Sequence, residues 1–194
     1  MRNIILIFLV TSTLLFSCLN KQAKISENAE SNNALNIILQ SYSLKNLSDK
    51  AVSDSDIETI LKCGLQAPSA RNLQPWYFTV IKDSTLAKKI IPETKNGNII
   101  IVVSGLNDGT QFGIVDLDCG FAIQNMYLGA QALGLGARIY TGPVNNVNSN
   151  FLGELNIPSK FKVVALIKIG YPEITDSSSA ASTRKNLSEF VNYK

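Results

Sequence analysis

The stretch APSARNLQPWYF, from Ala67 to Phe78, limits what this chain can fold into more than any other part of the sequence. A proline disfavours helical geometry in the residue before it, so the helical pattern that leads into this stretch must end before Pro68. From Trp76 the residues are aromatic and β-branched, which predicts a buried strand. A simple turn needs one proline or glycine, whereas this junction holds two prolines, a serine, an asparagine, a glutamine and the only tryptophan. The junction therefore indicates a site for a flat ligand.

Helical and strand patterns are interleaved along the rest of the chain. A short helix begins near Ala34 and loses its pattern around Ser41. Further helices are predicted over residues 55–67, 83–90, 118–133 and 148–155, and strands over residues 76–82, 98–104, 137–141 and 161–172. This succession indicates one layered domain of the α/β or α+β class.

Three features of these elements guide the interpretation, and two of them have an alternative. Ser55 and Glu58 have the spacing of a capping box, which predicts that Ser55 caps its helix. The helix over 118–133 is apolar nearly all round, so it is expected in the core or in a subunit interface, and a core helix without any dimer is the alternative. Trp76, taken alone, is more typical of a core residue than of a ligand site.

The composition excludes several classes of function. The chain has 194 residues, of which 45% are apolar, enough for the core of one soluble domain. Its net charge of +3 is too small to indicate a nucleic-acid partner. The absence of histidine excludes Ser-His-Asp and Cys-His catalysis and most catalytic zinc sites. We therefore expect no metal and no nucleic acid, and chemistry that comes from carboxylates, thiols, amines or a cofactor.

The N-terminus is predicted to be a targeting segment. Residues 1–17 combine an early arginine with an apolar run too short for a comfortable membrane span, and the ending LFSC resembles the cleavage box of bacterial lipoproteins. By that resemblance Cys18 is lipidated, which makes the protein a membrane-anchored lipoprotein outside the cytoplasm. An uncleaved anchor or an ordinary signal peptide is the alternative. Residues 18–33 are polar and typical of a flexible tether, and residues 34–194 form the domain.

Two cysteines remain in the domain, Cys63 and Cys119. In an oxidising compartment they could form a disulfide. Both lie in apolar helical patterns, where a free thiol behaves as a small hydrophobic group. Two unpaired core thiols are the favoured prediction.

Four segments, in the same order, resemble the nitroreductase family of flavoproteins. The first is PSARNLQPW, at residues 68–76. The others are CGFAIQNMYLGAQALGLGARIYTG, VVALIKIGYPE and RKNLSEFV, which resemble the central helix and its following strand, the last core strand and the C-terminal arm of that family. The resemblance implies an α+β fold with a central, mostly antiparallel sheet flanked by helices. It also implies an intertwined homodimer with an FMN cofactor at each of two interface sites.

The resemblance assigns two groups of residues to the flavin ring. One wall of the isoalloxazine site would come from the junction residues Pro68, Ser69, Ala70 and Asn72. A second group follows the central helix and would contact the flavin near N5, partly through a backbone N–H: Tyr140, Thr141 and Gly142.

A third group would bind the phosphate. The family grips the FMN phosphate and ribityl chain with Arg-x-Ser-x-Arg or Arg-x-Ser-x-Lys at the start of the domain. The matching stretch here is SYSLK, in which Ser43 and Lys45 are kept and Ser41 replaces the first arginine. That change removes one bidentate phosphate donor. Arg184 in the C-terminal arm fits a second phosphate ligand, so a weaker cationic grip remains.

These assignments predict an FMN-dependent oxidoreductase. Electrons would pass from NAD(P)H, or from a periplasmic or membrane donor, to a nitroaromatic, a quinone or a similar small acceptor. The cofactor carries the chemistry, so no catalytic side chain is required. A lipoprotein outside the cytoplasm has no evident supply of NAD(P)H. The alternative is therefore a flavin- or ligand-binding lipoprotein of the same fold without redox turnover, which the loss of arginine at Ser41 slightly favours.

Overall fold

The computed structural model describes residues 33–109, 114–173 and 182–194. The predicted signal segment, the predicted lipidation of Cys18 and the predicted tether up to residue 32 lie outside these residues. Residues 33–40 form a helix, which confirms that the helical pattern is lost at Ser41. This helix belongs to a unit of its own, and the sheet belongs to the unit that begins at Ser41. Across the described ranges, no helix is both long and apolar enough to cross a membrane.

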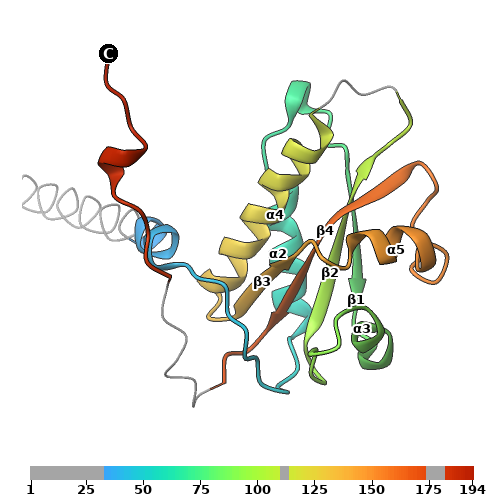
Figure 1. Cartoon of the computed structure of the whole chain (residues 1–194). Helices are drawn as coiled ribbons and strands as arrows, with labels where there is room; N and C mark the ends of the chain where they lie inside the picture. Colours follow the sequence, from blue (N-terminus) through green and yellow to red (C-terminus); the bar gives the residue numbers. More distant parts are fainter. Residues whose placement is uncertain (1–32, 110–113, 174–181) are drawn as a thin grey trace, which may run out of the picture. The chain divides into compact units, whose positions relative to one another are not determined.

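A four-stranded sheet forms the centre of the second unit (Figure 1). Its strands are β1 (Trp76–Ile81), β2 (Ile99–Leu106), β3 (Gly136–Tyr140) and β4 (Phe161–Gly170). They lie in the order β1-β2-β4-β3, and every neighbouring pair is antiparallel. The predicted antiparallel sheet is thus confirmed.

The two central strands carry most of the core. The run from Ile100 to Val103 on β2 has no exposed surface. Burying a side chain of this size stabilises the fold by about 1.5–3 kcal/mol relative to leaving it in water. In contrast, β1 lies at the edge of the sheet, and only Trp76 and Ile81 at its two ends are buried. The prediction of a buried strand there was wrong, because aromatic and β-branched residues also suit a half-covered edge.

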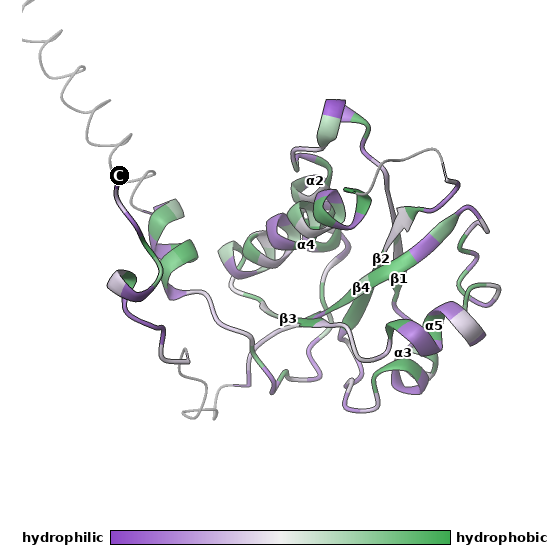
Figure 2. Cartoon of the chain, turned by 45° about the horizontal axis from the view of Figure 1, so that its top comes forward, coloured by the Kyte–Doolittle hydropathy of each residue, from purple (hydrophilic) through white to green (hydrophobic). Residues whose placement is uncertain are grey.

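Helices cover both faces of this sheet. On one face lie α2 (Asp54–Leu65) and α4 (Val115–Ala132), and on the other lie α3 (Ser84–Ile90) and α5 (Val144–Asn150) (Figure 1). Each face has its own hydrophobic cluster, and Figure 2 shows β4 as a mostly hydrophobic band between the helix layers. The architecture is α+β, as predicted.

Several helix boundaries differ from the sequence prediction. The N-cap of α2 is Ser53, whose Oγ accepts a hydrogen bond from the backbone N–H of Asp56 at 3.1 Å. The capping box predicted at Ser55 was wrong, because serines at 53 and 55 offer two similar caps and the chain uses the first. The helix predicted over 148–155 corresponds to α5, which spans Val144–Asn150, so it both begins and ends earlier than predicted.

Candidate functional site

The junction between α2 and β1 is a tightly folded polar loop, defined here as the 68–74 loop. It contains the 3₁₀ turn η1 (Ala70–Asn72) and three non-glycine residues with left-handed backbone geometry: Arg71 at φ 53°, Asn72 at φ 56° and Gln74 at φ 47°. Such geometry is unfavourable for L-residues and persists where the surroundings fix it. Concentrated strain of this kind is typical of functional sites.

Hydrogen bonds within the loop and from the core fix this shape. The backbone N–H of Gln74 donates to Ser69 Oγ at 3.0 Å, and Gln74 Nε2 donates to Asn72 Oδ1 at 3.2 Å. At the start of η1, the backbone N–H of Ala70 donates to the carboxylate of Asp118, which lies 48 residues away on α4. Asn72 is exposed and Ser69 is half-buried, so the loop presents polar groups on a fixed surface.

Trp76 does not belong to this surface. Its side chain is 8% exposed and packs in the hydrophobic cluster beneath α4. It also lies parallel to the ring of Phe78, with the centroids 6.3 Å apart. The core interpretation of Trp76 is confirmed, and it anchors the end of the loop to the sheet.

A second group of predicted site residues lies beside β3. The backbone N–H of Leu44 donates to the carbonyl of Ala137 at 3.2 Å, which places the SYSLK stretch along this edge strand. Leu44 is buried against Gly136, where an ideal Cβ would lie 2.4 Å from Leu44 Cδ2. Any larger residue at Gly136 would displace the stretch. Ser43 and Lys45, on either side of Leu44, are exposed.

The end of β3 is also accessible. Thr141 and Gly142 follow its last residue, Tyr140, and both are exposed. An ideal Cβ at Gly142 would meet no atom within 4 Å, so the backbone here faces open space. A ligand can therefore approach Gly142 from the side of this missing Cβ without a steric barrier.

The two groups lie on opposite edges of the sheet. The 68–74 loop leads into β1, whereas Thr141 and Gly142 leave β3, and β2 and β4 lie between them. Three interstrand spacings amount to about 14 Å. Arg184 is exposed and donates to the carbonyl of Ser182 at 2.9 Å. Among the described residues, no hydrogen bond or ion pair joins Arg184 to Ser43 or Lys45. One chain therefore does not unite the predicted site residues.

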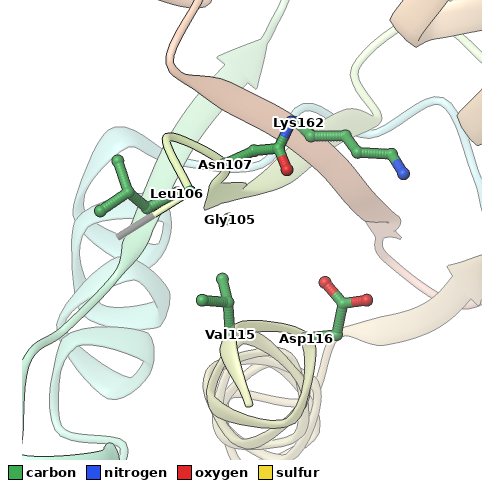
Figure 3. A pocket seen from close by; sticks show the side chains of 7 residues that line it. Gly105, Leu106, Asn107, Val115, Asp116 and Lys162 are labelled. Atoms are coloured by element: carbon green, nitrogen blue, oxygen red, sulfur yellow. The ribbon is translucent and has the colours of Figure 1, made fainter. Parts of the chain in front are cut away.

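A small cavity lies at the end of β2, where the backbone N–H of Leu106 donates to the carbonyl of Pro75 at 2.8 Å. It has a volume of about 250 Å³ and lies between the end of β2, the start of α4 and β4. Asn107 and Lys162 lie on one side of it, and Val115 and Asp116 lie on the other (Figure 3). Sites for cofactors of flavin size usually measure about 300–1,000 Å³. This cavity is too small to enclose a flavin.

Comparison with known proteins identifies the family. A model of the Nitroreductase family matches residues 38–104 and 94–171. A protein of Archaeoglobus fulgidus, provisionally named NADH dehydrogenase/NAD(P)H nitroreductase, is 30% identical over 162 residues. That match covers 78% of this chain and 92% of the archaeal protein. This chain belongs to the nitroreductase family.

Two further proteins illustrate the similarity. A provisionally named nitroreductase of Desulfovibrio desulfuricans, solved in complex with FMN, aligns with a TM-score of 0.71 and 30% identity over 83% of this chain and 96% of that one. The FMN reductase (NADPH) of Bacillus subtilis is 24% identical over 166 residues, which cover 73% of this chain and 66% of the relative.

At the end of β3, this nitroreductase-family chain has a charged cluster that the sequence interpretation missed. Tyr140 donates through its hydroxyl to Glu93 at 2.8 Å, and the Arg138 guanidinium lies 5.0 Å from the Tyr140 ring centroid. Lys168 on β4, the register partner of Arg138, is 1% exposed, and its Nζ lies 5.6 Å from the same centroid. Burial and the Glu93 carboxylate raise the pKa of Tyr140, and burial lowers the pKa of Lys168. A lysine within the apolar run VVALIKIG was the available signal.

Both cysteines are free in this structure, as predicted. Cys119 is completely buried, and Cys63 is half-buried. Burial, together with the charges of Asp116 and Asp118, raises the pKa of the Cys119 thiol to about 12. A thiol with this pKa holds almost no thiolate at neutral pH, so Cys119 is a structural core residue rather than a nucleophile.

Proposed function

We propose that this protein is an FMN-dependent oxidoreductase that takes electrons from a reduced nicotinamide and passes them to a small acceptor such as a nitroaromatic or a quinone. The observation that carries the proposal is the strained polar 68–74 loop, which occupies the family signature in a fold similar to the FMN-bound protein of Desulfovibrio desulfuricans. When bound, FMN supplies the hydride chemistry. The chain supplies binding and orientation.

The described residues fit such a cofactor. Ser69 and Asn72 offer a hydroxyl and an amide for the rim of the ring, Thr141 is exposed, and a Cβ added at Gly142 would face open space. Ser43 and Lys45 offer a hydroxyl and an ammonium group for a phosphate. A few fixed polar groups on an otherwise apolar surface are what a flat heteroaromatic ligand requires.

We further propose that the functional unit is a homodimer. The 68–74 loop and the residues that follow β3, Thr141 and Gly142, lie on opposite edges of one sheet. A second copy of the chain is therefore needed to bring one group of each kind together. The outward side of α4 carries large apolar side chains that a monomer leaves in water, since Leu117 is 56% exposed and Phe121 is 41% exposed. Clustered exposed apolar groups are typical of subunit interfaces.

The phosphate grip predicts a difference between FMN and riboflavin. Substituting Lys45→Met should weaken FMN binding about tenfold, because one charge-assisted contact to the phosphate is lost. Riboflavin has no phosphate, so its affinity should not change. Quenching of flavin fluorescence measures both. Lys88→Met on α3, which covers the face of the sheet opposite α2 and α4, serves as the control. An equal loss for both flavins would show that Lys45 does not contact the phosphate.

The alternative function is a flavin-binding lipoprotein without redox turnover, and Ser41 in place of the family arginine favours it. The two functions differ in whether NADH or NADPH reduces the bound flavin. Lipid attachment at Cys18 remains a proposal from the sequence, and mass spectrometry of the chain extracted from membranes tests it. A mature chain without diacylglycerol on Cys18 would refute the anchor.

A further inference from the structure

Asp118 is an unusual residue for the interior of this domain. It is 3% exposed and lies in the first turn of α4. Burying a carboxylate is costly unless it accepts hydrogen bonds. Its two oxygens lie 3.1 Å and 3.3 Å from the backbone nitrogen of Ala70, which donates to them at the start of the 68–74 loop. A buried carboxylate on the central helix thus anchors the predicted flavin loop across 48 residues of sequence.

The loop needs such an external anchor. Arg71, Asn72 and Gln74 all adopt left-handed geometry that L-residues rarely choose. Ser69 Oγ, which accepts from Gln74 N, closes the loop on itself but does not attach it to the core. The bond from Ala70 to Asp118 does attach it, at the residue where η1 begins. A hydrogen bond to a charged acceptor is about twice as strong as a neutral one.

We propose that Asp118 is a positioning residue for the flavin site. Its carboxylate fixes the start of the 68–74 loop, and so sets Ser69 and Asn72 in place before the cofactor binds. This rests on the proposed function. Fixing the loop in advance removes the entropy cost of ordering it during binding. Asp118 acts through Ala70 and does not touch the flavin.

Limited trypsin digestion tests the anchor without any flavin. Arg71 is exposed within the loop, so cleavage after it reports how often the loop opens. In the full chain, Asp118→Ala should raise the cleavage rate at Arg71 about tenfold. Asp118→Asn keeps an amide oxygen that accepts from Ala70, so its rate should rise less, by about fivefold or under.

Asp83→Ala is the matched control. Asp83 Oδ1 accepts a hydrogen bond from the backbone N–H of Leu86 at 2.7 Å and caps α3, so this variant loses the same kind of bond elsewhere. It should raise the rate of trypsin cleavage at Lys88 and Lys89 on α3 and leave the rate at Arg71 unchanged. Far-UV circular dichroism identifies variants that fail to fold, and if Asp118→Ala fails, the comparison of Asp118→Asn with Asp83→Ala decides. Equal Arg71 cleavage in these two folded variants would overturn the anchor.

Flavin titration distinguishes the positioning role of Asp118 from the proposed phosphate binding by Lys45. Asp118→Asn should weaken FMN and riboflavin binding by the same factor of about five, because the loop serves the ring. Lys45→Met should weaken FMN alone. Unchanged affinity of Asp118→Asn for both flavins would overturn the positioning role. If the wild-type chain binds neither flavin, the proposed function and the flavin role of Asp118 both fail, while trypsin cleavage still decides whether Asp118 orders the loop.

Discussion

Replacing Lys168 with methionine is expected to raise the free energy of unfolding by about 1–3 kcal/mol at neutral pH, because a methionine in a buried site avoids the cost of removing an ammonium group from water. Lys168 is 1% exposed on the central strand β4, and its cross-strand neighbour is the cationic Arg138. Glu93 is the carboxylate that attracts it, and Lys95 adds a further repulsive charge. Methionine has a similar length and adapts well to irregular packing. Urea unfolding of both proteins measures the change.

The pH dependence of this gain has a definite sign. Burial lowers the pKa of Lys168 in the folded state, so between that pKa and the unfolded value of 10.5 the unfolded chain binds more protons. The contribution of Lys168 to stability therefore rises with pH in this window. The advantage of Lys168→Met should shrink from pH 7 to pH 10. Lys162→Met, at an exposed position of the same strand, should change stability by less than about 0.5 kcal/mol at either pH. A destabilised Lys168→Met protein would contradict the account of this cluster.

Replacing Gly97 with alanine is expected to destabilise the domain by about 2–5 kcal/mol, from left-handed strain and overpacking together. Gly97 has φ +81°, and an ideal Cβ there would lie 2.4 Å from the carbonyl oxygen of Asp49 and 2.8 Å from the nitrogen of Ala51. Both obstacles are backbone atoms, which cannot rotate away. The carbonyl of Gly97 also accepts a hydrogen bond from Val52 at 3.1 Å, so displacement breaks a second contact.

Gly134→Ala separates the two parts of this effect. Gly134 has a similar φ of +76°, yet an ideal Cβ there meets nothing within 4 Å. Its substitution should cost only the backbone strain, about 1–2 kcal/mol. Thermal or urea unfolding of both variants gives the steric part as the difference. Equal losses would mean that the segment around Asp49 yields to the new methyl group.

Local patterns predicted the elements of this fold well. The aromatic and β-branched run at 76–81 and the apolar run at 99–106 are strands because their composition suits little else. The position of each strand within the sheet was harder to predict from the local sequence. β1 carries the pattern of a buried strand, but it lies at the edge, because strand order depends on how distant segments pair. The cap of α2 was misplaced because Ser53 and Ser55 are equally suited to the role.

The site was predicted only in part, again because contacts between distant segments cannot be found from local sequence. The polar junction at 68–74 stood out in the sequence, since so many rigid and polar residues exceed the needs of a turn. Its anchor did not, because Asp118 is 48 residues away and reaches Ala70 only after α4 packs on the sheet. Similarly, Lys168 joins Glu93, Arg138 and Tyr140 only through strand pairing and loop placement. Residue types indicate which chemistry is available, and the tertiary fold decides which groups meet.

The central claim is most directly tested by the visible absorption spectrum of the full chain, purified and mixed with FMN in the absence of air. The proposed function predicts bound-flavin bands that bleach when NADH or NADPH is added and return when menadione or nitrofurazone follows. If the bands appear but neither NADH, NADPH nor another biological donor bleaches them, the protein binds flavin without redox turnover. A folded chain that binds no FMN at all would contradict the account.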